Sequence, residues 1–442
     1  MIFDCFTFFD ELDLLEVRLR TLDGVVDRFV LCEAPFTFRG APKPLYFSEA
    51  RERFARWNDK ISVLVYDAAV NADPWENEWG QRDFLIRGLE GAVPDDLVLL
   101  SDCDEIPDPN NVPRRPSTKP VLGHRQIYAL GYVNRLSPET WIGTRSVEVR
   151  NLPSDGQLRK LRMIAERDMD VVDGGWHFSH LGGSEVVERK MKSFSHSEFD
   201  VPYYTDRRRL QTEFGSNVNV DFVPVDERFP PVLHEDGPWK RFIWNGPVIT
   251  DAAESRARQH VHGCFAYVPD DAARVVAVTV ASEHSLWEEI GRERFGSRFA
   301  GATRSLSSPL EANSWVVLDG FERADVRTLA TIAEGALGVV AFLRNARSVV
   351  RFDELLLGSG FPEGRAIGIG DLLTWAGSAG RSVAGIDRLQ APNIYAPWTQ
   401  MAESLVNVTV GMWLSFTAIS RDALADFFAQ AFIVRLPPPQ TP

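Results

Sequence analysis

Leu97 to Pro107 read LVLLSDCDEIP, in which four consecutive aliphatic residues are followed by three carboxylates within four positions. An aliphatic run without alternation is typical of a central strand of an α/β sheet, because both faces of such a strand are covered. Pro107 cannot donate to a sheet ladder, so we expect the strand to end there. Residues at the carboxyl end of such a strand open into the crevice where α/β proteins bind ligands. The segment therefore predicts a buried strand that delivers carboxylates to a ligand site.

Asp102 and Asp104 are separated by one residue. In extended backbone their side chains share a face and can approach one hard cation, so we expect them to bind a divalent metal that carries a phosphate-bearing substrate. The alternative is a solvated acidic turn, since short motifs also occur by chance. Asp168-Met169-Asp170 repeats the spacing without an aliphatic run before it.

The composition is that of a soluble globular protein, with 44% hydrophobic and 25% charged residues among 442. A net charge of -14 argues against sequence-independent binding to nucleic acid, which requires a basic surface. Four widely spaced cysteines suggest neither a zinc site nor a disulfide framework. The N-terminus lacks the pattern of a signal peptide, and the longest uncharged window, Ser404 to Ser420, is short for a membrane span. We therefore expect a cytoplasmic protein without an integral membrane segment.

The first part of the chain alternates between strand and helix patterns. Strand candidates are Phe3 to Phe9, Val25 to Glu33 and Ile61 to Tyr66, and helix candidates are Glu11 to Leu22 and Trp75 to Leu89. This alternation predicts an α/β fold with an open, largely parallel sheet covered by helices on both faces. The domain prediction is a first domain over 1–245, a linker over 246–270, a second α/β domain over 271–436 and a disordered tail over 437–442.

In the second domain, we expect strands at Val275 to Ala281, Trp315 to Leu318 and Val339 to Leu343, and a helix at Asp325 to Glu334. Together with Gly370 to Ala376 and Val383 to Ile386, this pattern resembles the later half of a Rossmann-type methyltransferase. The glycine-rich loop of that fold is missing after the first strand, where Ser282-Glu283-His284 follow. We therefore expect a degenerate, Rossmann-like accessory domain for acceptor binding or association rather than an active methyltransferase.

Further candidates for the site lie on both sides of the acidic strand end. The segment GGWHFSHLGG at Gly174 to Gly183 contains His177, which could complete a metal site begun by Asp104, because imidazole and carboxylate together suit manganese. A hydrogen-bonded structural histidine is the alternative. Polar side chains near these segments could contact the substrate's hydroxyl or phosphate groups, or could form solvated faces; they are Glu33, Gln81, Arg82, Lys190 and Lys192.

Five ordered blocks between residues 1 and 243 together resemble glycosyltransferase family 17, the β-1,4-mannosyl-glycoprotein β-1,4-N-acetylglucosaminyltransferases. The blocks are DCFTFFDELDLLEVRL at Asp4 to Leu19, PKPLYF at Pro42 to Phe47, the helix that starts at Trp75-Glu76, SDCDEIP at Ser101 to Pro107, and Gly175-Trp176-His177. The resemblance implies a GT-A-like fold, a nucleotide-sugar donor and inversion at the anomeric carbon. It also implies that Asp102 and Asp104 bind the metal diphosphate.

The implied reaction is a direct displacement in which a general base deprotonates the acceptor hydroxyl while Mn²⁺ or Mg²⁺ offsets the charge on the leaving diphosphate. Glu105 and Glu76 are the candidate bases. The expected donor is UDP-GlcNAc. Eukaryotic members carry a Golgi membrane anchor, which this sequence does not show, so we expect a bacterial-type enzyme acting on a surface polysaccharide, a lipid-linked glycan or a small molecule. The competing hypotheses are a metal-dependent phosphohydrolase and a non-catalytic glycan-binding protein.

Overall fold

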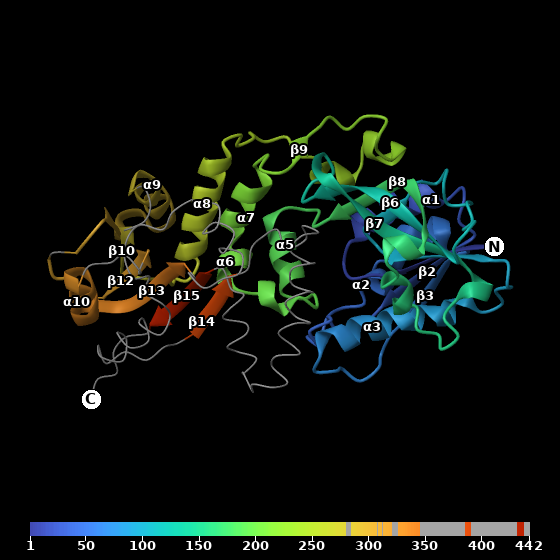
Figure 1. Cartoon of the computed structure of the whole chain (residues 1–442), viewed down its shortest axis with the longest axis horizontal. Coiled ribbons are helices and arrows are strands. Elements are labelled where there is room, and N and C mark those ends of the chain that lie inside the picture. Colours follow the sequence, from blue (N-terminus) through green and yellow to red (C-terminus); the bar gives the residue numbers. More distant parts are fainter. Residues whose placement is uncertain are drawn as a thin grey trace. The chain divides into compact units, whose positions relative to one another are not determined.

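The computed structural model describes residues 1–279, 284–306, 308–311, 313–320, 326–344, 385–389 and 431–436. The chain divides into two compact units (Figure 1). Unit 1 comprises Met1–Asp200 and Tyr204–Arg256, and unit 2 comprises Val201–Tyr203 and Ala257–Pro442. Both units combine helices with a sheet, so the predicted α/β fold class is confirmed.

Unit 1 is built on one large sheet. Its strands are β1 (Ile2–Thr7), β2 (Arg28–Glu33), β3 (Ile61–Val65), β4 (Leu97–Asp102), β5 (Glu105–Pro107), β6 (Val121–Leu130), β7 (Arg135–Glu148), β8 (Asp170–Ser179) and β9 (Asp221–Phe222). Its helices are α1 (Leu12–Leu22), α2 (Tyr46–Glu49), α3 (Pro74–Phe84), the 3-10 helix η2 (Leu85–Leu89), α4 (Arg159–Arg162), α5 (Ser184–Met191) and α7 (Arg207–Phe214). The strands and helices predicted before residue 107 are all present, with ends shifted by up to three residues.

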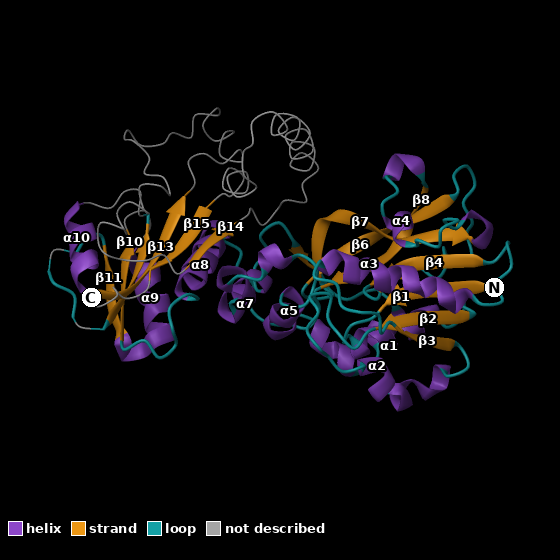
Figure 2. Cartoon of the chain, turned by 90° about the horizontal axis from the view of Figure 1, so that it is seen from below, coloured by secondary structure: helices purple, strands orange, loops and turns teal. Residues whose placement is uncertain are grey.

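The strand order in this sheet is β3-β2-β1-β4-β7-β6-β8-β5, and β9 pairs with β7. The first four strands run parallel, and Figure 2 shows them side by side. Beyond β4 the sheet is mixed, because β7 pairs antiparallel with β4 and β6, and β5 pairs antiparallel with β8. The expectation of a largely parallel sheet is therefore right only for the first half. Since β1 lies between β2 and β4, the connections change direction at β1 and β4, which is where such sheets bind ligands.

Strand β4 is buried on both faces, as its sequence predicts. Leu97 and Leu99 belong to the hydrophobic cluster that includes Leu15 of α1. Val98 and Leu100 belong to a second cluster, formed by residues that alternate with the first set along the strand. Burial on both sides fixes the strand, and hence the position of the acidic residues at its carboxyl end.

Unit 2 contains a second, smaller sheet of order β11-β10-β12-β13-β15-β14. Its elements are α8 (Ala252–Phe265, which begins in unit 1), β10 (Arg274–Thr279), α9 (His284–Phe295), β11 (Phe299–Thr303), β12 (Ser314–Asp319), α10 (Val326–Gly335), β13 (Ala336–Arg344), β14 (Gly385–Leu389) and β15 (Ala431–Leu436). Strands β11, β10, β12 and β13 are parallel, and β15 is antiparallel to both of its neighbours. The strands and the helix predicted between 275 and 343 are present.

The segment 246–270, predicted as a linker, contains one complete helix. Helix α8 occupies Ala252–Phe265, and the division between the units falls within it, after Arg256. Gly370 to Ala376, Ser404 to Ser420, the tail 437–442 and residues 280–283 after β10 lie outside the described residues. The resemblance of this half to a methyltransferase, and the missing loop, therefore stay predictions.

Two further expectations concern disulfide bonds and membrane-spanning helices. The four cysteines, Cys5, Cys32, Cys103 and Cys264, are buried and form no disulfide. Among the helices within the described ranges, none combines the length and the apolar character needed to cross a bilayer.

Candidate functional site

Arg18 of α1 holds the short turn that joins β4 to β5, where the acidic residues lie. The Arg18 side chain has no exposed surface. Its guanidinium pairs with the buried Asp4 at 2.6 and 2.8 Å and donates to the carbonyl oxygens of Asp102, Cys103 and Glu105 at 3.1, 3.2 and 2.8 Å. One buried cation therefore satisfies three carbonyl groups of the turn and holds its shape.

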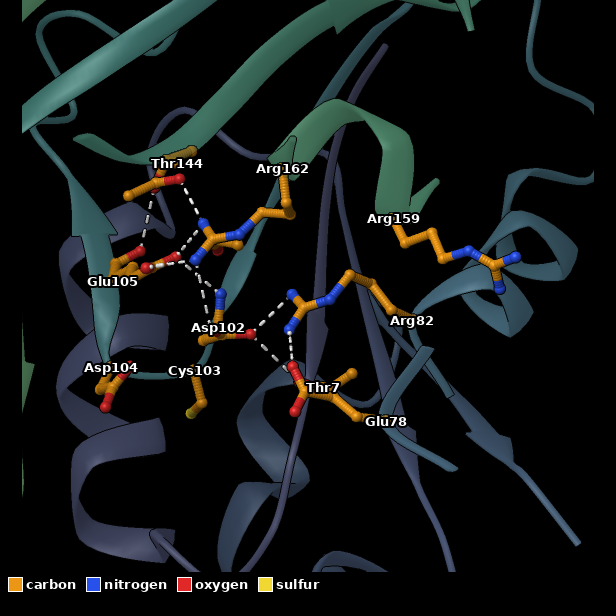
Figure 3. Close-up of polar contacts among 12 residues, drawn as sticks. Thr7, Glu78, Arg82, Asp102, Cys103, Asp104, Glu105, Thr144, Arg159 and Arg162 are labelled. Atoms are coloured by element: carbon orange, nitrogen blue, oxygen red, sulfur yellow. Dashed lines mark hydrogen bonds and ion pairs between the residues drawn. The ribbon is translucent and has the colours of Figure 1, made fainter. Parts of the chain in front are cut away.

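Asp102 lies between two arginines (Figure 3). Its carboxylate accepts from Arg82 Nη1 at 2.7 Å, and Arg162 Nη2 lies 3.3 Å away. Burial by itself would raise the pKa of Asp102, but Arg82 and Arg162 outweigh it and hold this pKa well below its usual range. Asp102 is therefore ionised at neutral pH and already neutralised by protein cations.

Asp104 has a different set of partners. Lys190 Nζ lies 3.1 Å from Oδ2, and His177 Nε2 lies 3.7 Å from Oδ1. Burial opposes ionisation, but Lys190 and His177 prevail and lower the pKa of Asp104. The prediction that Asp102 and Asp104 share a face rested on extended backbone. Cys103 and Asp104 instead form a turn between β4 and β5, and Figure 3 shows the two carboxylates pointing in different directions.

The structure places His177 beside Asp104, and the metal site that the two would form stays a prediction. Glu105 pairs with His177 in the β5–β8 ladder, which brings the imidazole next to the turn. The ring is stacked on Tyr128, with centroids 4.9 Å apart and planes at 11°, and lies 5.2 Å from the Trp141 ring. These contacts with the two aromatic rings help to fix the direction of Nε2 toward the Asp104 carboxylate.

Asp104 and His177 could bind a divalent cation as a pair, without the further protein ligands of a complete metal cage. In the described part of the chain, no group of three histidine, cysteine or carboxylate side chains is arranged to bind a metal. Oδ1 of Asp104 and Nε2 of His177, 3.7 Å apart, are close enough to bind the same cation at metal–ligand distances of about 2.1 Å. Cations that act on phosphates are often bound by one or two side chains, with substrate oxygens and water completing the shell.

The two predicted general bases are placed differently. Glu105 is almost completely buried and accepts from Arg162 at 2.6 and 2.7 Å, from Trp141 Nε1 at 2.7 Å and from the amide of Asp102 at 2.9 Å. With both oxygens bound to donors, its carboxylate is suited to fixing the turn and Arg162 rather than to accepting a proton. Glu76 is exposed on the first turn of α3.

The remaining residues predicted to contact the substrate fall into two groups. Arg82 is buried against Asp102, and Gln81 is buried beside it on α3; Lys190 lies at Asp104. Glu33 instead accepts from the amides of Phe47 and Ser48 at the start of α2. Lys192 is half exposed and pairs with Glu188 at 2.6 Å on α5. The structure therefore gives Glu33 and Lys192 local structural contacts.

A pocket lies next to the turn and contains residues that the sequence alone did not single out. Its lining includes Asp10 and Glu11, which follow β1, together with Asp104, His180 and Lys190. It thus lies at the carboxyl ends of β1 and β4, where the connections change direction. Arg162, which bridges Asp102 and Glu105, was also missed. Its segment, Arg159–Arg162, is short and carries no motif, so the sequence offers no local signal for it.

The comparisons agree with the resemblance found in the sequence. The model of the family "Glycosyltransferase family 17" matches residues 1–241. Two relatives, the beta-1,4-mannosyl-glycoprotein 4-beta-N-acetylglucosaminyltransferases of Homo sapiens and Rattus norvegicus, are each 37% identical over 106 residues, which is 22% of this chain. The match spans only 20% of the length of either relative.

Solved structures are less similar. The [4+2]-cyclase SpnF covers 45% of this chain and 87% of its own chain at 17% identity, with a TM-score of 0.25. HddC from Yersinia pseudotuberculosis covers 40% of this chain and 90% of its own at 9% identity, with a TM-score of 0.24. Likenesses at this level assign neither fold nor function.

Proposed function

Because this chain belongs to glycosyltransferase family 17, we propose that it transfers N-acetylglucosamine from UDP-GlcNAc to a hydroxyl group of a glycan or lipid-linked acceptor, with inversion, on a GT-A-like unit 1. The observation that supports this most is the pairing of Asp104 with His177 at the carboxyl end of β4, beside a pocket at the switch point of the sheet. The relatives' names motivate the sugar.

Asp104 and His177 are the residues that would hold Mn²⁺ or Mg²⁺. When bound, the cation would offset the negative charge that develops on the leaving diphosphate. Asp104 is ionised, as a metal ligand must be, because Lys190 and His177 lower its pKa. Among the residues that the structure describes, the buried Nδ1 atom of His177 has no hydrogen-bond partner, so the stacked ring of Tyr128 and the tilted ring of Trp141 orient the imidazole.

Protein cations would supply the rest of the charge. Lys190 and Arg82 lie on opposite sides of the turn, at Asp104 and Asp102. Each ammonium or guanidinium can contact a diphosphate oxygen while it stays close to its carboxylate partner. An acidic protein thereby acquires a local site for an anionic donor, since each carboxylate at the turn is neutralised before the donor arrives.

The test is the release of UDP from UDP-GlcNAc by the full chain, with and without Mn²⁺. We expect turnover only with the metal, and a loss of about a hundredfold or more in Asp104→Asn. Asp155→Asn is the matched control, because Asp155 is also an aspartate paired with a lysine, Lys160, but lies on the surface. It should retain full activity.

Other outcomes would refute the proposal. Release of phosphate from simple esters, with no action on sugar nucleotides, would indicate a phosphohydrolase. Glycan binding that persists in Asp104→Asn, without turnover in the wild type, would indicate a binding protein.

A further inference from the structure

The charges that line the pocket beside the turn are almost all paired. Asp104 pairs with Lys190 at 3.1 Å, and Asp10 pairs with Arg189 at 2.8 Å. The third cation of the lining, Arg241, pairs with Asp13 at 2.7 Å. These pairs neutralise five of the six charged side chains that face the pocket.

Glu11 is the exception. Its Oε2 atom accepts from the amides of Phe9 and Asp10 at 3.2 and 3.1 Å. Within the part of the chain that the structure describes, no ion pair reaches this carboxylate and no hydrogen bond reaches Oε1. The amides of its own turn, immediately before α1, thus fix the side chain by one oxygen and leave the other available in a pocket.

The surroundings of Glu11 also make its carboxylate more basic. Burial raises the pKa of Glu11 against the opposing effect of Lys190, and the carboxylates of Asp10 and Asp104 add to the rise. A carboxylate with a raised pKa is a stronger base than an ordinary glutamate. By contrast, Glu105 already binds four donors, and Glu76 is exposed on α3.

We propose that Glu11 is the general base of the transfer reaction and that the acceptor hydroxyl enters the pocket beside Asp104. This inference rests on the proposed function. The hydroxyl proton passes to Oε1 of Glu11 while the hydroxyl oxygen forms a bond to the anomeric carbon. The bond from that carbon to the diphosphate oxygen breaks, and the diphosphate leaves with the electron pair. The same residue would activate water in the slower hydrolysis of the donor.

The experiment compares the wild type, Glu11→Gln and Glu16→Gln in the full chain. The substrates are UDP-GlcNAc with Mn²⁺ and a panel of p-nitrophenyl glycosides or water as acceptor. Glutamine keeps the size of the side chain but cannot take a proton, so we expect Glu11→Gln to lower kcat by about 10² to 10⁴. UDP should still raise the melting temperature as it does in the wild type. Glu16 lies one and a half turns along α1, pairs with Arg53 at 2.8 Å and is absent from the pocket lining, so Glu16→Gln should be unaffected.

A kcat in Glu11→Gln within threefold of the wild type would overturn the proposal. So would a loss of UDP binding that accounts for the lost activity, because Glu11 would then belong to the donor site. If Glu11→Gln does not fold, Glu11→Ala with added formate replaces it: a small carboxylate should restore turnover, and failure to do so counts against the proposal. A wild type that neither binds UDP nor releases it would instead refute the proposed function itself.

Discussion

Arg18 stabilises the acidic turn through an ion pair with Asp4 and hydrogen bonds to three of the turn's carbonyl groups. Replacing it with methionine would leave the buried Asp4 carboxylate without a cation and three carbonyl groups of the turn without their donor. Removing one partner of a buried ion pair costs about 3–5 kcal/mol. We therefore expect Arg18→Met to lower the unfolding free energy by that amount, measured by chemical denaturation.

Arg20→Met is the control, because Arg20 lies on the same helix and its pair with Glu235 is partly exposed. An exposed pair is worth at most about 1 kcal/mol. Equal losses in the two variants would contradict the role given to Arg18.

At the scale of residues, the sequence predicts the candidate metal ligands better than the residues around them. Asp104 and His177 could be proposed together, because each stands in a stretch with its own signal, an aliphatic run or flanking glycines. The prediction that Asp102 and Asp104 share a face was wrong, because Cys103 and Asp104 form a turn and not extended strand. Arg18 was missed because the carbonyl groups that it binds lie more than eighty positions away, and Glu11 because the pocket that it lines includes residues more than ninety positions away.

At the scale of elements, the packing of strand β8 against β5 determines where His177 lies in the site. Gly175 has φ +105°, and a Cβ atom there would lie 2.5 Å from the carbonyl oxygen of Ile106 and 2.8 Å from the amide of Asp108. Both atoms belong to the backbone beside β5, so the strand would have to move away and take the Glu105–His177 pairing with it. We expect Gly175→Ala to cost about 2–4 kcal/mol, from backbone strain and overpacking together, and to weaken UDP binding.

Gly156→Ala is the control for backbone strain alone. Gly156 has φ +72°, but a Cβ atom added there would meet no other atom within 4 Å. It should cost only about 1–2 kcal/mol and leave UDP binding intact. If thermal unfolding and UDP titration show the two variants to be alike, then close packing of β8 on β5 does not set the site.

Elements in the first hundred residues could be predicted because hydrophobic periodicity dominates them. The Leu97 to Leu100 run is buried on both faces, and α1 carries leucines at helical spacing. The antiparallel half of the sheet could not be predicted, because neither β6 nor β7 shows a regular alternation of buried and exposed residues, and both are rich in polar side chains. Their pairing is set by contacts with β4 and β8 rather than by a local pattern.

At the scale of the whole molecule, the family match and the candidate site both lie in unit 1. The accessory role of unit 2 stays a prediction. A chain with a net charge of -14 repels an anionic donor unless cations intervene, so the account depends on local positive charge at the turn.

Calorimetric titration of UDP into the full chain tests this most directly. The account predicts that UDP binds with Mn²⁺ present and at least about tenfold more weakly after chelation, because chelation would remove the cation that Asp104 and His177 would hold and that would offset the charge of the diphosphate. No detectable UDP binding with either Mn²⁺ or Mg²⁺, or binding of equal strength after chelation, would contradict it.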